Sequence, residues 1–185
     1  MSNINLPNFL TLVRILAVPF CTYALFKDHG TNTTWQFIAF CGFFAVGMTD
    51  FADGRIARSR KQITPFGEFM DPIADKIAVG TALISLSILD RLWWWVTILI
   101  LVREIGITIM RLTIIRTVVV PASRGGKAKT LFQGFGLLFY ILPLPTWLAL
   151  PRDIFMTIAV VLTVFTGIDY VLTIRKIQRN GLRNG

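Results

Sequence analysis

The sequence predicts an all-α integral membrane protein with six transmembrane helices and both termini in the cytoplasm. Of its 185 residues, 54% are hydrophobic and only 16% are charged, whereas soluble domains carry about 25% charged residues. The apolar residues gather in stretches that approach the ~20 residues needed to cross a bilayer as a helix. Basic residues are concentrated in alternate connections between these stretches, which is the pattern of the positive-inside rule.

The apolar stretches account for most of the chain and predict a single membrane domain over residues 1–185. The first contains Arg14, so its start is expected to lie along the membrane interface. A cleaved signal peptide is disfavoured there, because no basic residue precedes the stretch and no small-residue cleavage site follows it. The second is short, but its helical pattern continues through Asp50–Ala57. The six predicted spans are Phe9–Phe26, Trp35–Thr49, Ile73–Leu89, Leu92–Ile115, Leu131–Leu150 and Ile154–Ile174.

The distribution of charge orients these spans. One set of connections carries twelve basic residues and the opposite set carries three, so the richer set and both termini are expected in the cytoplasm. Trp35 and the run Trp93–Trp95 then form aromatic anchors at the far interface. The basic residues of the richer set are Arg55, Arg58, Arg60, Lys61, Arg116, Arg124, Lys127, Lys129, Arg175, Lys176, Arg179 and Arg183; the poorer set has Lys27, Arg91 and Arg152.

The composition excludes several other classes of protein. Fifteen Phe and five Trp in a chain of low charge exclude intrinsic disorder. Cys21 and Cys41 each lie in an apolar run and form no disulfide scaffold, and with one His they are too few for a zinc site. A net charge of +9 would suggest nucleic acid in a soluble protein. In a membrane protein it favours anionic lipid or an anionic substrate, so no nucleic-acid partner is expected.

Four of the eight aspartates fall within one 26-residue window at the basic, cytoplasmic edge of the predicted bundle. Asp50 and Asp53 are spaced i,i+3, and Asp71 and Asp75 are spaced i,i+4. Each pair therefore occupies one face of its helix. A solvated loop with ordinary surface charges is the alternative, but ionisable groups at membrane depth are costly and usually functional.

The segment between the two acidic pairs contains Thr64, Pro65 and Gly67, which predicts a tight turn between two antiparallel helices. This turn would bring the pairs face to face. Four facing carboxylates stay ionised only if a cation sits among them, and oxygen ligands without Cys or His favour Mg²⁺ or Mn²⁺. Two such ions can stabilise both oxygens of a phosphoryl displacement.

The same window resembles the motif of the CDP-alcohol phosphotransferase family, whose eight fixed positions all occur as Asp50-x2-Asp53-Gly54-x2-Ala57-Arg58-x8-Gly67-x3-Asp71-x3-Asp75. Six spans with the motif bridging the second and third also resemble that family, so the resemblance covers the whole chain. Members move a substituted phosphate from a CDP-linked lipid to an alcohol and release CMP. The resemblance further implies a homodimer.

For the acidic residues, the resemblance implies that Asp50, Asp53 and Asp71 hold two divalent cations, with Asp75 contributing. Asp75 would also be the general base on the acceptor hydroxyl. Elementary chemistry agrees with both roles. A pyrophosphate needs positive charge near its oxygens as CMP departs, and the attacking hydroxyl needs a nearby carboxylate to take its proton.

Contacts with the CDP part of the lipid are implied for further residues. Gly54 would let the nucleotide approach the backbone, and Arg58 and Thr64 would contact the cytidine diphosphate. A helix packing contact is the alternative for Gly54, and a positive-inside anchor is the alternative for Arg58. The N-terminal segment also resembles the family and adds three nucleotide contacts, Asn8, Thr11 and Arg14. Asn8 could equally cap the first helix.

The acceptor must be chosen by other basic residues. Arg103 and Arg111 lie two turns apart and project to broadly the same side of the fourth stretch. Glu104 lies beside Arg103 and could simply pair with one of these two arginines, and that structural pairing is the alternative for Arg103. A second group follows two glycines in the first turns of a predicted helix, where anions bind well. Its members are Lys127, Lys129, Thr130 and Gln133, and the alternative for the two lysines is neutralisation of anionic headgroups.

Three stretches, Asp71–Lys76, Val102–Arg111 and Gly126–Gln133, are similar to the phosphatidylglycerophosphate synthases, a branch of the family. Their acceptor is sn-glycerol 3-phosphate, a phosphorylated alcohol that would require an anion-binding cluster. The resemblance therefore implies transfer of a phosphatidyl group from CDP-diacylglycerol to sn-glycerol 3-phosphate, with release of CMP. The enzyme would act among membrane lipids, at the cytoplasmic side of a bacterial cell membrane.

Two alternatives remain open at this point. A sister enzyme would use inositol phosphate or phosphatidylglycerol as its acceptor. A divalent-cation transporter would use the four carboxylates for transport, but it should place them near the bilayer midplane. Here they lie at a basic cytoplasmic edge, which favours the transferase.

Overall fold

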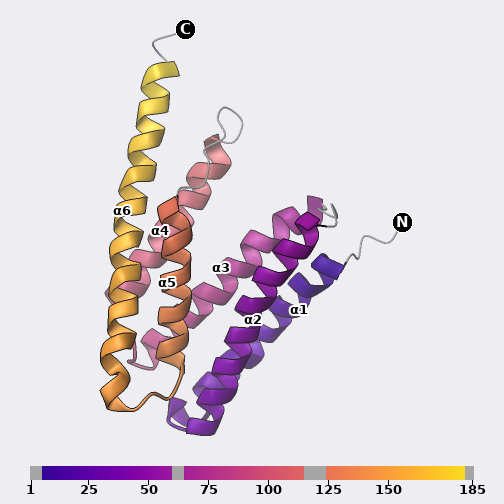
Figure 1. Ribbon diagram of the computed structural model, residues 1–185, viewed down its shortest axis with the longest axis vertical. Helices are drawn as coiled ribbons and strands as arrows, with labels where there is room; N and C mark the ends of the chain where they lie inside the picture. The colour runs from indigo at the N-terminus through magenta and orange to yellow at the C-terminus, as the bar shows by residue number, and fades with distance from the viewer. Residues whose placement is uncertain (1–5, 60–64, 115–123, 182–185) are drawn as a thin grey trace. The chain divides into compact units, whose positions relative to one another are not determined.

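The structure, a computed structural model, describes residues 6–59, 65–114 and 124–181. Side chains are described over 9–49, 72–110, 128–145 and 147–174. Within the described residues the chain is helical and has no strand, which confirms the predicted all-α class. The elements are α1 Leu6–Phe26, η1 Lys27–Gly30, α2 Thr33–Ser59, α3 Pro65–Ile88, α4 Trp94–Ile114, α5 Arg124–Ile141, η2 Thr146–Leu148 and α6 Ala149–Gly181 (Figure 1).

The six α-helices follow the six apolar stretches in order, with differences at their ends. The continuation of α2 through Asp50–Ala57 is confirmed. The assignment of Pro65 and Gly67 to a turn is wrong, since α3 begins at Pro65. Proline is favoured at the first position of a helix because its missing N–H has no helical partner there. Thr64 lies outside the described residues.

The fifth stretch differs more. The prediction of glycines ahead of the helix is wrong, because α5 begins at Arg124 and includes both of them. The prediction of one span over Leu131–Leu150 is also wrong, because α5 ends at Ile141. Pro143 and Pro145 follow, and proline lacks the N–H that would continue the helix and keeps the preceding residue out of the helical conformation.

Among the described residues, two helical segments have the length and apolar composition of a membrane span. The segments are Phe9–Gly30 and Ala149–Ile174, and Thr33–Thr49 is a shorter apolar helix. Only 17% of the most apolar stretch of α6 is buried inside the protein. A core helix of a soluble protein would be mostly buried, and this stretch of α6 is not.

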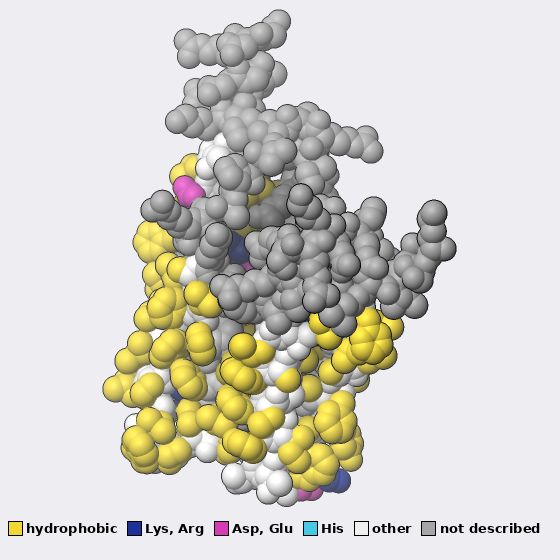
Figure 2. All heavy atoms as spheres, turned by 45° about the vertical axis from the view of Figure 1, so that its right-hand side comes forward, with side chains coloured by type: hydrophobic (Ala, Val, Ile, Leu, Met, Phe, Trp, Pro, Cys, Tyr) yellow, Lys and Arg dark blue, Asp and Glu magenta, His cyan; other side chains and the backbone are white. Residues whose placement is uncertain are grey.

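Exposed apolar residues form long rows on the helices. On α4, Ile98, Val102, Ile105 and Ile109 repeat at i, i+4, i+7 and i+11, and each is more than half exposed. A similar row runs along α6. In the view of Figure 2, hydrophobic side chains cover most of the described surface. Contiguous apolar surface of this extent marks a membrane or protein interaction surface. The α6 row comprises Val161, Phe165, Ile168 and Leu172.

The chain divides into two compact units. Unit 1 comprises residues 1–94 and 137–148, and unit 2 comprises residues 95–136 and 149–185. In unit 1, α1 packs against both α2 and α3 (Figure 1). The buried face of α1 includes Val18, Cys21 and Leu25, spaced i, i+3 and i+7, which is the spacing of one helical face.

At one end of unit 1, the carbonyl oxygen of Gly30 accepts hydrogen bonds from two side chains. Gly30 has a φ of +74°, a left-handed conformation that glycine adopts without steric cost. Its oxygen accepts hydrogen bonds from Gln36 Nε2 and from Arg91 Nη2, the latter at 2.6 Å. Arg91 Nη1 also donates to the carbonyl of Tyr140 at 3.4 Å. Arg91 therefore ties the turn between α1 and α2 to the end of α5.

The close approach of α1 and α2 depends on Gly42. A Cβ at this position would lie 2.5 Å from the Sγ of Cys21. We expect Gly42→Ala to lower the free energy of unfolding by about 1–3 kcal/mol, the usual cost of overpacking. The melting temperature in detergent would measure it.

Gly47→Ala provides the matched control, because it lies on the same helix and a Cβ there meets no atom within 4 Å. It should be neutral or slightly stabilising, since alanine favours a helix over glycine by up to about 1 kcal/mol. Gly42→Ala should also cost less in a Cys21→Ala background, where Sγ is absent. Equal melting temperatures for Gly42→Ala and Gly47→Ala would contradict this account of the α1–α2 contact.

Candidate active site

The four predicted carboxylates belong to two helices of unit 1. Asp50 and Asp53 are in α2, and Asp71 and Asp75 are in α3. The side chains of Asp50, Asp53 and Asp71 lie outside the described residues, and that of Asp75 is partly buried. Among the described side chains, no group of three His, Cys, Asp or Glu residues is placed to hold a metal ion. The described side chains do not include three of the four predicted ligands.

A small core cluster fixes which faces of these helices meet. Val18 of α1, Val46 of α2 and Ala78 of α3 are all buried and pack together. On α2, positions 50 and 53 follow Val46 at i+4 and i+7. On α3, positions 75 and 71 precede Ala78 by three and seven residues. Both acidic pairs therefore occupy the helical faces that α2 and α3 turn toward the shared core cluster.

The first helix contributes to the same region. Thr11 and Arg14 precede Val18 by seven and four residues, so they share its face of α1. Both are buried, each 2% exposed. Arg14 makes polar contacts within the protein, as a buried guanidinium must if its desolvation is to be offset. Since residues 27–32 join α1 to α2 and residues 60–64 join α2 to α3, these positions lie on the same side of the core cluster as the carboxylates.

The remaining residues predicted to contact CDP are described only in part. Gly54 and Arg58 belong to the last turns of α2, but Arg58 has no described side chain. Asn8 is the third residue of α1 rather than the residue that precedes it, so the alternative of an N-cap does not fit.

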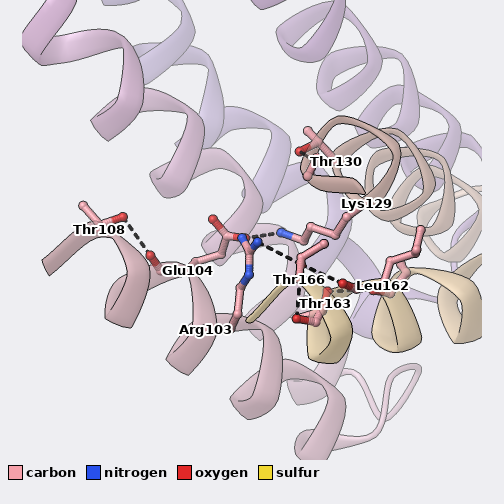
Figure 3. Close-up of polar contacts among 10 residues, drawn as sticks. Arg103, Glu104, Thr108, Lys129, Thr130, Leu162, Thr163 and Thr166 are labelled. Carbon is pink, nitrogen blue, oxygen red and sulfur yellow. Dashed lines mark hydrogen bonds and ion pairs between the residues drawn. The ribbon is translucent and has the colours of Figure 1, made fainter. Parts of the chain in front are cut away.

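Two of the predicted acceptor residues of unit 2, Arg103 and Lys129, converge on Glu104. Arg103 Nη1 donates to Glu104 Oε1 at 2.9 Å, and Lys129 Nζ donates to the same oxygen. Lys129 is only 3% exposed. Figure 3 shows Arg103 and Glu104 reaching from α4, and Lys129 from α5, to one point. The structural pairing of Arg103 with Glu104, which was the alternative to a role in acceptor binding, is thus present. Lys129 pairs with the same carboxylate.

The sixth helix supports this cluster. Arg103 Nη2 donates to Thr166 Oγ1 at 3.0 Å, and Thr166 Oγ1 in turn donates to the carbonyl of Leu162 at 2.6 Å. A Cβ at the adjacent Gly167 would lie 3.5 Å from the Cγ of Arg103, an ordinary packing distance. Arg103 is therefore held from α4 by Glu104 and from α6 by Thr166 (Figure 3).

Two buried polar atoms beside the cluster lack a hydrogen-bond partner among the described residues: Gln133 Oε1 and Arg103 Nε. Gln133 follows Lys129 by one turn of α5 and is 4% exposed. Buried polar atoms are nearly always paired, so such atoms commonly mark the place of a ligand or ordered water.

Among the described side chains, the predicted acceptor residue Thr130 is not part of this network. Thr130 is exposed and donates to the carbonyl of Gly126 at 3.1 Å, one turn back on α5. The side chains of Arg111 and Lys127 lie outside the described residues. The structure thus brings Arg103 and Lys129 together and leaves Arg111 and Lys127 as predictions.

Residues 4–165 match the sequence profile of CDP-alcohol phosphatidyltransferases. The chain belongs to this family. A "probable phosphatidylglycerophosphate synthase" of Mycobacterium tuberculosis is 47% identical over 90% of this chain and 80% of its own length. Proteins named "CDP-diacylglycerol--glycerol-3-phosphate 3-phosphatidyltransferase" are 35% identical in both Rickettsia felis and Bacillus subtilis. They cover 93% and 90% of this chain and 96% and 93% of their own lengths.

Membership of the CDP-alcohol phosphatidyltransferase family confirms the predicted resemblance and makes the protein a transferase. The matched residues include all four carboxylates and the whole cluster around Glu104 except Thr166 and Gly167. Sequence reasoning missed Thr166, because nothing in the local sequence connects a threonine of α6 with an arginine of α4. It named Glu104 only as a possible structural partner of Arg103 or Arg111.

Proposed function

We propose that this transferase moves the phosphatidyl group from CDP-diacylglycerol to sn-glycerol 3-phosphate, giving phosphatidylglycerol phosphate and CMP. The observation that carries the choice of acceptor is the similarity over about nine-tenths of the chain to proteins named for this reaction. The basic cluster of the partly buried Arg103 and the buried Lys129 supports an acceptor that carries a phosphate.

In the proposed reaction, Asp75 takes the proton of the acceptor's primary hydroxyl. The hydroxyl oxygen forms a bond to the phosphorus nearer the diacylglycerol. The bond between that phosphorus and the bridging oxygen breaks, and CMP leaves with the electron pair. General-base assistance of this kind contributes about 10²–10⁴-fold to a rate. Asp75 is partly buried on the face of α3 that adjoins the core cluster.

The carboxylate ligands proposed on α2 and α3 suit divalent cations. Asp50, Asp53 and Asp71, with Asp75, supply only carboxylate oxygens, which suit Mg²⁺ or Mn²⁺. Two such ions, when bound, would offset the negative charge that develops on the leaving pyrophosphate oxygen. The placement of both acidic pairs beside Val46 and Ala78 supports a shared set of ligands.

The donor nucleotide is proposed to lie against the end of α2 and the start of α1. Gly54 would admit the nucleotide close to the backbone, while Arg58 and Thr64 would contact its phosphates and cytidine. Asn8 and Thr11 would contribute from α1. The burial of Thr11 and Arg14 on the Val18 face of α1 supports this part of the proposal.

The acceptor phosphate is proposed to bind the basic residues of unit 2. Lys129 and Arg103 form its described part, and Gln133 offers a buried oxygen to a hydroxyl of the acceptor. The proposed site is completed by Arg111, Lys127 and Thr130.

In this proposal the protein crosses a bacterial cell membrane six times, with both termini and the active site at the cytoplasmic side, as a homodimer. The rows of exposed apolar residues on α4 and α6 support contact with lipid tails. The exposure of Trp93, Trp94 and Trp95 supports their role as anchors, because tryptophan favours the membrane–water interface.

The test is CMP release by the purified protein in detergent with CDP-diacylglycerol, Mn²⁺ and one acceptor at a time. The acceptors are glycerol 3-phosphate, inositol phosphate, inositol, serine and phosphatidylglycerol. We expect release with glycerol 3-phosphate alone. Release with another acceptor would overturn the acceptor assignment and retain the carboxylate chemistry. No release with any acceptor, combined with metal uptake into vesicles, would favour the transporter.

A further inference from the structure

The strongest unassigned feature of the molecule is the carboxylate at the centre of the unit 2 cluster. Glu104 Oε1 accepts from Lys129 Nζ and from Arg103 Nη1. If Arg103 and Lys129 bind a phosphate, a neighbouring carboxylate that only competed with the phosphate for them would weaken its binding. The carboxylate can instead fix where the two cationic groups lie.

The need for such a group follows from the burial of Lys129. Its side chain is 3% exposed, and a lysine side chain has several rotatable bonds and a flexible stem. A buried ammonium without a partner is strongly disfavoured. Glu104 supplies a charge-assisted contact that holds the ammonium at a single position.

The same carboxylate links elements that are separate in the sequence. Glu104 and Arg103 belong to α4, Lys129 belongs to α5, and Arg103 reaches Thr166 on α6. The guanidinium of Arg103 is thus fixed at both of its terminal nitrogens by Glu104 and Thr166. Its Nε remains without a described partner, as does Gln133 Oε1 one turn from Lys129. A ligand beside Arg103 and Lys129 could therefore accept a hydrogen bond from Arg103 Nε and donate one to Gln133 Oε1.

We propose that Glu104 is the positioning residue of the acceptor-binding cluster, holding Lys129 and Arg103 in the arrangement that receives the acceptor's phosphate. This inference rests on the proposed function for the identity of the acceptor. Glu104 touches neither substrate nor reacting atoms in this role. It acts through the two cations, with Thr166 as the second support of Arg103.

The test compares Glu104→Gln with Glu104→Asp in steady-state kinetics, each substrate being varied in turn. Glu104→Gln keeps the volume of the side chain and removes its charge. We expect the KM for glycerol 3-phosphate to rise about tenfold, which corresponds to about 1.4 kcal/mol. The KM for CDP-diacylglycerol should stay within about twofold, because the donor is assigned to residues of unit 1. Glu104→Asp retains the charge and should recover most of the affinity for the acceptor.

Thr108→Val is the matched control on α4. Thr108 Oγ1 donates to the backbone carbonyl of Glu104 at 2.7 Å and, among the described residues, forms no hydrogen bond with a side chain of the cluster. Its kinetic constants should equal those of the wild type. Thr166→Val removes the other support of Arg103 and should raise the same KM by a smaller factor, which keeps the inference testable if Glu104→Gln does not fold.

A readout independent of turnover separates this inference from the proposed function. Inorganic phosphate should raise the melting temperature of the wild type by binding the folded state, and the rise should be largely lost in Glu104→Gln and kept in Thr108→Val. Failure of the wild type to use glycerol 3-phosphate would overturn the function and leave this measurement valid. An unchanged acceptor KM in Glu104→Gln, or equal losses for both substrates with no rescue by Glu104→Asp, would overturn the positioning role.

Discussion

The Asp75→Asn variant should bind CDP-diacylglycerol as the wild type does and release CMP about 10²–10⁴-fold more slowly, the usual contribution of a general base. Asparagine keeps the shape of the side chain and one oxygen, but an amide cannot take the proton of the acceptor hydroxyl. Asp75 is partly buried within α3, close to the Val18–Val46–Ala78 cluster, so the isosteric change should leave the packing intact. Single-turnover CMP release would measure the rate.

Asp90→Asn is the matched control for this experiment. Asp90 is exposed in the turn after α3 and has a φ of +52°, a conformation that asparagine tolerates well. This variant should keep full activity. Donor binding in Asp75→Asn can be checked by the stabilisation that CDP-diacylglycerol gives to the folded protein. Wild-type turnover in Asp75→Asn would refute the general-base assignment, and loss of donor binding would assign Asp75 to the donor site.

The part of the active site on α2 and α3 could be predicted because it depends on local periodicity. Positions 50 and 53 share a helical face by their spacing alone, as do positions 71 and 75. The structure adds the reason that these faces adjoin, since Val46 and Ala78 lie on the same faces and pack together with Val18. No sequence pattern selects Val18 as the third member, because many apolar residues of α1 have equivalent spacing.

Helix ends are harder to predict, because proline and glycine occur both in turns and in the first turn of a helix. Pro65 reads as a turn residue, yet it is the first residue of α3, where proline is favoured. Gly125 and Gly126 read as a loop ahead of a helix, yet they belong to the first turn of α5. In both places the local preference of one or two residues does not decide between a turn and the first turn of a helix.

The contacts around Glu104 could not be predicted from the sequence, because they join residues of three different helices. The neighbouring Arg103 is visible as a candidate partner, but Lys129 lies on another helix, 25 positions along the chain. Thr166 is 63 positions from Arg103, and nothing distinguishes it from the threonines that only bond their own helix. Contacts of this kind are set by the packing of α4, α5 and α6, which periodicity alone does not specify.

Removal of divalent cations should abolish the activity. In the proposed metal site the four carboxylates of α2 and α3 would repel one another, and a bound cation would let all of them remain ionised. The charge stabilisation supplied by such ions is worth several kcal/mol, so EDTA should lower CMP release by more than about a hundredfold. Added Mg²⁺ or Mn²⁺ in excess should restore it. The measurement is CMP release by one preparation before chelation, after chelation and after restoration.

EDTA saturated with Mg²⁺ before its addition is the control, because it separates loss of the ion from effects of the chelator on detergent or lipid. The melting temperature distinguishes a catalytic role from a structural one. If the ions only relieve repulsion in the fold, chelation should unfold the protein, and activity should not return at once on adding the metal. Prompt recovery from a folded, inactive state supports ions that act on the substrate. Undiminished CMP release in EDTA would show that the Asp50–Asp75 carboxylates stay apart or protonated, and the proposed metal site would be withdrawn.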